Sequence, residues 1–159
     1  MRGSRVKTRI GPIAFAVAVL ALASCTSLAQ KPEGFAEVSP WQVAAAQYKA
    51  VSPEGMIYRV RTLKNYPVQT LEFWASALKN HLEKEGYRSV SDGQPFEAGE
   101  SPGMLFEWAM PYGNQSYIYI TAIVVSEKKI AVAEAAAEHT IYYKYREALL
   151  ESLASITIR

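Results

Sequence analysis

The sequence predicts an α+β fold in which a curved antiparallel sheet of about five to six strands is packed by two main helices. Segments between residues 104 and 137 alternate between two faces, or are apolar on both, as strands of such a sheet do. Residues 71–82 and 141–156 instead carry apolar side chains at three- and four-residue spacing, which is typical of helices that cover a sheet. Earlier in the chain, Pro53-Glu54-Gly55 separates two strand-like segments and predicts a hairpin.

The first 25 residues have the layout of a bacterial secretory signal. Residues 1–9 carry four basic and no acidic side chains, and the 15 residues 10–24 carry no charge. The single cysteine, Cys25, follows Leu22, Ala23 and Ser24. These four residues resemble the lipobox of bacterial lipoproteins, which implies that Cys25 is lipidated on sulfur. The alternatives are an uncleaved spanning helix, for which the run is shorter than the ~20 apolar residues needed, and ordinary cleavage that leaves a free thiol.

Lipidation implies a permanent place in the cell envelope with the membrane as a partner, because two or more acyl chains, such as palmitate, anchor a protein stably. Thr26 is not the aspartate that retains lipoproteins at the inner membrane in enteric-type sorting. In a Gram-negative host we therefore expect the outer membrane, with the protein facing the periplasm. After a signal peptide at 1–24, the small and polar residues of 25–39 predict a lipidated N-terminus and flexible tether, and 40–159 form a single domain.

Charge and cysteine content exclude several classes of protein. Four of the 17 basic residues precede Cys25 whereas all 15 acidic residues follow it, so the mature chain has a net charge of −2. This charge gives no basic footprint for nucleic acid. Because the one cysteine would carry lipid, the mature chain has neither disulfides nor a thiolate metal site, and its stability depends on packing.

The first elements of the domain are a short helix and a hairpin. Ser39-Pro40 has the chemistry of a helix start and predicts a short helix to about Ala46, although the same residues could begin a strand. Tyr48–Ser52 and Met56–Leu63 are the arms of the hairpin. Arg59 and Arg61 project from the same side of the second arm, about 7 Å apart. They could hold an anionic group, or they could be solvated charges at a sheet edge.

A helix and a long loop are expected next. Leu71–Lys84 has the clearest helical spacing, with Thr70 as the N-cap and Gly86 as the stop. Tyr87–Val90 is expected to form a short strand. Residues 92–103 contain two prolines and three glycines and predict the longest loop of the domain.

Three strands and a final helix complete the pattern. Residues 104–110 place large side chains on one face, residues 117–125 are apolar on both sides and predict a central strand, and residues 130–137 place alanines on one face. The alanine-rich segment could also be helical. Thr140 is the expected cap of the last helix, and Ile156-Thr157-Ile158 an extended tail.

Three tyrosines in the last helix cannot all face inward. At 100° per residue, if Tyr145 packs inward with Ile141, then Tyr142 or Tyr143 must lie near solvent. Exposed tyrosines are favoured contact residues at interfaces. We therefore predict a possible interaction surface at Tyr142 and Tyr143, together with the two arginines of the hairpin.

The order of these elements resembles the PsbP and Mog family of small domains. The likeness rests on the early hairpin, the tryptophan-containing helix Leu71–Lys84, and the run 129–132 followed by 142–153. The resemblance covers about 110 residues and implies a PsbP/Mog-like sandwich that binds or helps assemble larger complexes without catalysis. It transfers no metal or partner residue.

The residues offer little for catalysis. His81 and His139 lack the spacing of a zinc site and are expected at the surface or a junction, and the sequence contains no phosphate-binding loop or nucleophile elbow. We therefore expect no catalytic residue, no metal and no cofactor. The predicted function is a membrane-anchored, non-catalytic protein-binding or adaptor domain with an envelope protein as partner. The alternative is a carrier of a small apolar or lipid ligand between sheet and helices, and a third hypothesis is an envelope hydrolase.

Overall fold

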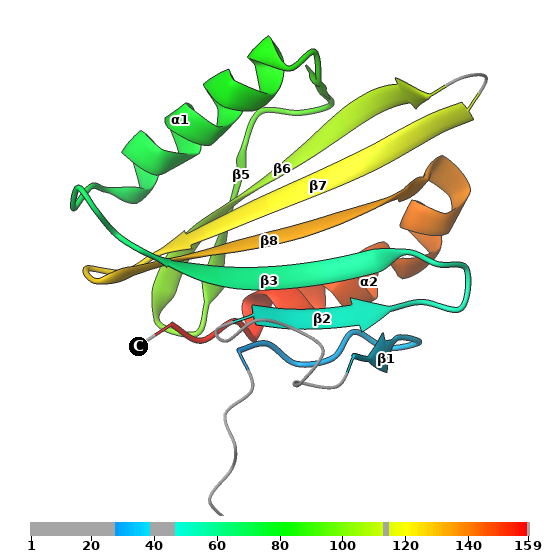
Figure 1. The fold of residues 1–159 in the computed structure, drawn as a ribbon, viewed down its shortest axis with the longest axis horizontal. Helices are drawn as coiled ribbons and strands as arrows, with labels where there is room; N and C mark the ends of the chain where they lie inside the picture. Colours follow the sequence, from blue (N-terminus) through cyan, green and yellow to red (C-terminus); the bar gives the residue numbers. More distant parts are fainter. Residues whose placement is uncertain (1–27, 39–46, 113–114, 159) are drawn as a thin grey trace, which may run out of the picture.

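The computed structural model describes residues 28–38, 47–112 and 115–158 (Figure 1). The signal segment with Cys25, and the short helix expected at residues 39–46, lie outside the described residues. In the part of the chain that is described, no helix is long and apolar enough to cross a membrane.

All the strands belong to one antiparallel sheet with the order β1-β2-β3-β8-β7-β6-β4, and β5 pairs with β6. The strands are β1 Ala36–Glu37, β2 Gln47–Val51, β3 Ile57–Lys64, β4 Arg88–Ser89, β5 Gln94–Ala98, β6 Ser101–Tyr112, β7 Gln115–Val125 and β8 Lys129–Glu138. The antiparallel sheet with two helices confirms the predicted α+β class. The sheet has eight strands rather than five to six, because β1 forms in the predicted tether and β5 in the predicted loop.

That loop prediction is wrong: residues 94–98 form β5, which makes a hairpin with β6 through the turn at Gly99 and Glu100. Pro95 is tolerated because β5 is paired on one side only. Gly103 allows a close approach, since a Cβ there would lie 2.6 Å from the Phe96 ring. Proline and glycine therefore mark a tightly packed edge hairpin, not an irregular loop.

The first helix, α1, spans Leu71–Lys84 and packs against β6 and β7. Thr70 caps it as predicted, its hydroxyl accepting a hydrogen bond from the Phe73 backbone N–H. Gly86 follows with a φ of 91°, the left-handed conformation expected where this helix stops.

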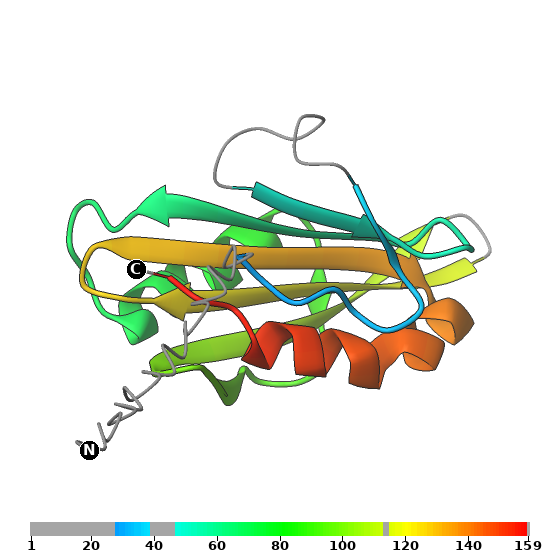
Figure 2. The ribbon, with the colours of Figure 1, turned by 90° about the horizontal axis from the view of Figure 1, so that it is seen from below.

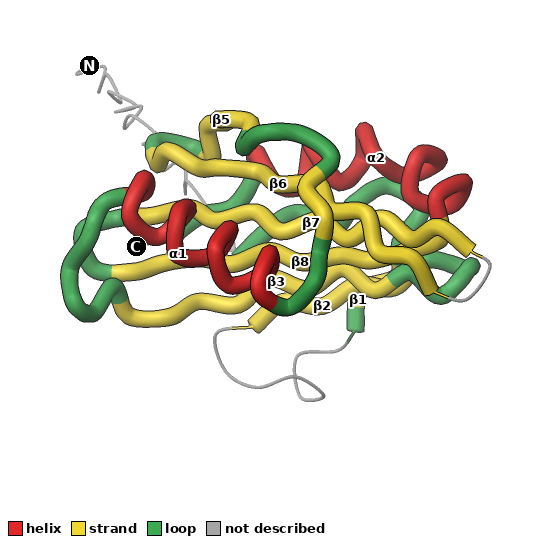
Figure 3. The backbone as a smooth tube through the Cα atoms, turned by 90° about the horizontal axis from the view of Figure 1, so that it is seen from above, coloured by secondary structure: helices red, strands yellow, loops and turns green. Residues whose placement is uncertain are grey.

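The second helix, α2, spans His139–Ala154 and packs on the opposite face of the sheet, against β8, β7 and β5 (Figure 3). Its N-cap is Glu138 and not the predicted Thr140: the Glu138 carboxylate accepts a hydrogen bond from the Thr140 backbone N–H at 2.9 Å. A carboxylate is favoured there by the partial positive charge of a helix N-terminus. The predicted alanine face of β8 is confirmed, because Ala131, Ala133 and Ala135 lie buried in the core on the α2 side.

Each face of the sheet has its own core. The larger core fills the space between α2 and the sheet, and its most deeply buried large side chains include Tyr58, Ile120, Leu149 and Leu153. The smaller core lies under α1 around Trp108, whose indole N–H donates to the Thr121 hydroxyl at 2.9 Å. The central position predicted for residues 117–125 is confirmed, since β7 lies between β6 and β8 and contributes to both cores.

Residues 28–38 are part of the domain, so the flexible tether predicted for 25–39 is wrong over this range. Ala29 and Phe35 are buried in the larger core, and Ser152 of α2 donates a hydrogen bond to the Gln30 carbonyl. The segment runs along α2 (Figure 2) and ends in β1, which pairs with β2. Its small and polar composition suits a strap over a helix as well as a linker, so composition could not distinguish the two.

Candidate functional site

The predicted pair Arg59 and Arg61 lies on a part of the sheet that neither described helix covers. Both side chains project from β3 on the face that carries α1, but α1 packs on β6 and β7, and in Figure 1 the neighbouring strands β8, β3 and β2 face the viewer without a helix in front of them. We call this surface the open face. It comprises Lys49, Val51, Ile57, Arg59, Arg61, Glu134 and Ala136.

A single carboxylate organises the charges of the open face. Glu134 on β8 accepts a hydrogen bond from an Arg59 terminal nitrogen at 2.8 Å, and its carboxylate lies 3.5 Å from the Arg61 Nε. The Tyr119 hydroxyl from β7 donates to the other oxygen of Glu134 at 2.8 Å. Burial, and then the hydrogen bond to Glu134, raise the pKa of Tyr119, so it remains a neutral donor.

Arg59 and Arg61 lie on a strand inside the sheet. The arginines are not charges at a sheet edge, because β3 is paired on both sides. Arg59 and Arg61 share one carboxylate, and their two guanidinium groups offer more N–H donors than two carboxylate oxygens can accept. Lys49, which is opposite Arg59 on β2, adds a third cation to the open face. The open face can therefore bind an anionic group such as a carboxylate, with exposed Ile57 providing apolar contact beside it.

The other two predicted interaction residues lie on α2, on the opposite side of the sheet. Tyr143 is 49% exposed, which confirms that one of the two tyrosines lies near solvent. Its ring lies 4.7 Å from that of His139. Tyr142 is only 1% exposed, so its assignment to an interaction surface is wrong. It is turned inward because its hydroxyl donates to the Glu107 carboxylate at 2.7 Å, and Arg146 Nε donates to the same oxygen at 3.0 Å. The four predicted residues thus do not form one site.

A second surface, which the sequence analysis did not predict, lies at the loop that joins β3 to α1. Leu63, Tyr66 and Val68 are 50%, 84% and 65% exposed, and we call these three side chains the loop tip. Beside them is a shallow hollow of about 480 Å³ lined by Lys64, Asn65, Tyr66, Val68, Glu127, Lys128 and Lys129. Exposed apolar side chains in a loop can only be recognised once the fold shows that nothing covers them.

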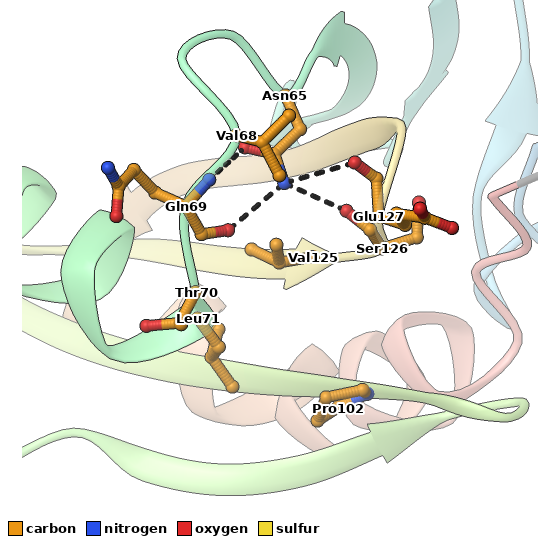
Figure 4. Close-up of a pocket in the computed structure, with 9 residues that line it drawn as sticks. All are labelled: Asn65, Val68, Gln69, Thr70, Leu71, Pro102, Val125, Ser126 and Glu127. Atoms are coloured by element: carbon orange, nitrogen blue, oxygen red, sulfur yellow. Dashed lines mark hydrogen bonds between the residues drawn. The ribbon is translucent and has the colours of Figure 1, made fainter.

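Asn65 holds this loop in place (Figure 4). Its amide nitrogen donates to the carbonyls of Gln69 and Ser126, and its amide oxygen accepts from the Gln69 backbone N–H and the Trp74 indole N–H, all at 2.8–3.0 Å. One buried side chain therefore ties the loop to α1 and to the β7–β8 turn.

Little in the described residues points to metal chemistry. No group of three or more His, Cys, Asp and Glu side chains is placed there to hold a metal ion. His81 and His139 are both exposed and lie in different helices.

Comparison with known proteins informs the fold. No family model and no curated protein matches the sequence. Among solved structures, LpqN of Mycobacterium tuberculosis, which is involved in cell envelope biogenesis, superposes with a TM-score of 0.58 at 12% identity, over 79% of this chain and 78% of LpqN. PA94 of Pseudomonas aeruginosa gives 0.59 at 6% identity, over 79% of this chain and 97% of PA94.

One of the similar structures is from the family that the sequence resembles. Cyanobacterial PsbP from Synechocystis superposes with a TM-score of 0.51 at 8% identity, over 79% of this chain and 82% of PsbP. The order of hairpin, helix, antiparallel strands and final helix is therefore arranged in space as the resemblance implied, and the chain has a PsbP-like fold.

Proposed function

We propose that this protein is a lipid-anchored cell-envelope protein whose domain binds a partner protein at the open face without catalysing a reaction. The observation that carries the proposal is the cluster of Arg59, Arg61 and Glu134 on sheet strands against which neither α1 nor α2, the two described helices, packs on this face. Arginine is enriched at protein interfaces, whose centres are apolar, and the open face places Arg59 and Arg61 beside the exposed Ile57. Its excess of cations favours a partner that presents a carboxylate.

The cellular setting is supported by the N-terminal sequence and by the fold. The basic start, apolar run and Leu22-Ala23-Ser24-Cys25 favour lipidation at Cys25. The PsbP-like fold is shared with LpqN, which is involved in cell envelope biogenesis. In a Gram-negative host, Thr26 after the cysteine favours the outer membrane.

The carrier alternative is less well supported. A lipid ligand between the sheet and α2 needs an apolar cavity of several hundred Å³. That space is instead filled by large side chains of the larger core, among them Tyr58, Leu149 and Leu153, each at most 1% exposed. A packed interior favours recognition at the surface.

Site-specific photo-crosslinking in living cells tests the proposal. A photo-reactive amino acid at position 57 lies on the open face, whereas one at position 151 lies on the exposed side of α2. We expect one discrete crosslinked product from position 57 and none of the same mass from position 151. Adding Arg59→Glu should weaken this product, because a second carboxylate then lies beside Glu134. Arg59→Glu with Arg61→Glu should abolish it, because three carboxylates would then repel a carboxylate of the partner.

Anchoring is measured separately. Mass spectrometry of the N-terminal peptide should show the lipid on Cys25, and Cys25→Ala should abolish it. Equal crosslinking at the two positions, or none at position 57 with the lipid present, would contradict binding at the open face while leaving the anchor intact.

A further inference from the structure

The loop that carries the exposed apolar side chains of the loop tip is held by the hydrogen bonds of Asn65. Asn65 is only 4% exposed and hydrogen-bonds to Trp74 of α1 and to the β7–β8 turn, while Tyr66 and Val68, one and three positions further on, are exposed. Leu63 at the end of β3 adds a third exposed apolar side chain. A group of exposed apolar side chains of this kind marks a contact surface.

Three lysines surround the loop tip. Lys64 and Lys129 are directly opposite each other in the β3–β8 register, and Lys128 accepts the Asn65 backbone N–H in the adjoining turn. Like charges directly opposite in an antiparallel pair are destabilising. With Glu127 as the one acid among the residues that line the hollow, the surface has the sign that attracts an anionic ligand.

The N-terminal segment joins the domain at the same end of the sheet as the loop tip. β3 ends and β8 begins at this end, and α2, which runs back along β8, has its C-terminal end there (Figures 1 and 2). The Ala154 carbonyl accepts a hydrogen bond from Gly99 in the β5–β6 turn, and the Leu28 carbonyl accepts one from the Thr157 backbone N–H. The N-terminal segment is thus fixed to the end of α2 from Leu28 onward.

This attachment leaves little free chain before the domain. Cys25 lies three residues before Leu28, which corresponds to about 10 Å of fully extended chain. A lipid on Cys25 therefore brings the bilayer close to the end of the sheet that carries the loop tip. Tyrosine and lysine are the side chains that suit a membrane interface, with an apolar body and a polar end.

We propose that the loop tip docks on the surface of an anionic lipid bilayer, with Tyr66 and Val68 at headgroup depth and the lysines on acidic headgroups. This inference rests on the proposed lipid anchor at Cys25. It orients the domain with one end of the sheet on the membrane, and leaves the open face accessible from the side.

Fluorescence of a label at the loop tip tests the inference on the full lipidated protein. Because Cys25 would be blocked by lipid, Val68→Cys supplies the one free thiol for an environment-sensitive label, and Ser116→Cys, exposed at the far end of β7, supplies the control. The two labelled proteins are placed in vesicles of phosphatidylcholine alone or with phosphatidylglycerol. We expect a blue shift and a several-fold loss of quenching by aqueous iodide for position 68 in the anionic vesicles, and neither change for position 116.

Charge reversal supplies the second arm. Lys64→Glu with Lys128→Glu should restore iodide quenching at position 68, whereas Lys84→Glu with Arg88→Glu, two exposed positions away from the loop, changes the total charge equally and should not. Circular dichroism checks that both variants fold.

The outcomes separate this inference from the proposed function. Lipid mass on Cys25 with equal quenching at positions 68 and 116 in every vesicle overturns membrane docking and leaves the anchor. Protection of position 68 in native membranes but not in protein-free vesicles means that a protein covers the tip, and also overturns it. Absence of lipid mass on Cys25 overturns the anchor and, with it, this inference.

Discussion

Glu107 of β6 and Tyr142 of α2 meet inside the protein, where the tyrosine hydroxyl donates to a carboxylate oxygen at 2.7 Å. Both residues are buried, and Arg146 lies 3.0 Å from the same oxygen and balances its charge. Burial, and then the hydrogen bond to Glu107, raise the pKa of Tyr142, so this tyrosine stays protonated as a donor. A charged carboxylate in the core is thereby paired on both sides, which is the condition for its being tolerated.

Removing the hydroxyl of Tyr142 should destabilise the protein. Tyr142→Phe leaves the ring in place but deprives a buried carboxylate of one donor, and hydrogen bonds to charged groups contribute about 2 kcal/mol. Urea denaturation should show this loss in the free energy of unfolding. Tyr143→Phe, on the exposed neighbour, is the control and should change it by less than about 0.5 kcal/mol. Equal effects of the two changes would contradict the contrast in burial.

The buried Tyr48 should make the protein sensitive to alkali. Burial, and then the nearby charge of Glu37, raise the pKa of Tyr48 to about 12, whereas an unfolded tyrosine has a pKa of about 10. Because the folded state holds the proton more tightly, this contribution to stability is full below pH about 10 and is lost as the pH rises toward 12.

Tyr48→Phe isolates that contribution. The Tyr48 hydroxyl is buried and has no hydrogen-bond partner among the described residues, so its removal should leave stability at neutral pH equal or higher. Above pH about 10 the variant should lose less stability than the parent. Urea midpoints across the alkaline range measure both effects, and parallel curves for the two proteins would refute the assignment to Tyr48.

Glu54 should set part of the response to acid. Hydrogen bonds from Lys144 and then from Tyr145 lower the pKa of this carboxyl to about 2. A lowered pKa in the folded state stabilises the protein above the unfolded value of about 4.3, and this stabilisation is lost as the pH falls toward 2. Glu54→Gln should therefore be less stable than the parent at neutral pH, with the two proteins converging in acid. A difference that stayed constant with pH would show that the charge of Glu54 is not responsible.

Local periodicity was sufficient to predict most of the fold. The alternation in β6 and β8 and the apolar spacing of α1 are set by burial on one face, which a sequence records directly. The hairpin of β5 could not be predicted, because Gly103 and Pro95 act there through the packing of Phe96 and through an unpaired edge. Those are tertiary circumstances, and glycine and proline by themselves indicate a loop.

Only part of the candidate site could be predicted from the sequence, for the same reason. Arg59 and Arg61 could be placed on one face from strand geometry, but the carboxylate that binds them, Glu134, is 75 residues away from Arg59. Which of Tyr142 and Tyr143 faces inward depended on Glu107, which lies on another element. Pairing across long sequence distances follows from topology, which period and composition do not encode.

The placement of residues 28–38 on the domain gives a final prediction, at Gly34. Its φ is +80°, and a Cβ there would lie 2.9 Å from the Tyr145 ring of α2, so an added methyl group meets both backbone strain and a steric clash. Gly55 has a similar φ of +86°, but none of the described residues lies within 4 Å of the added atom, so Gly55→Ala measures the strain alone. We expect Gly34→Ala to lower the free energy of unfolding by about 1–3 kcal/mol more than Gly55→Ala does. Gly34→Ala should also make the chain more susceptible to cleavage at Lys31 in limited proteolysis, because residues 28–38 would no longer pack on α2. If residues 28–38 were a free tether instead, position 34 would tolerate alanine and Lys31 would be cleaved equally in both variants.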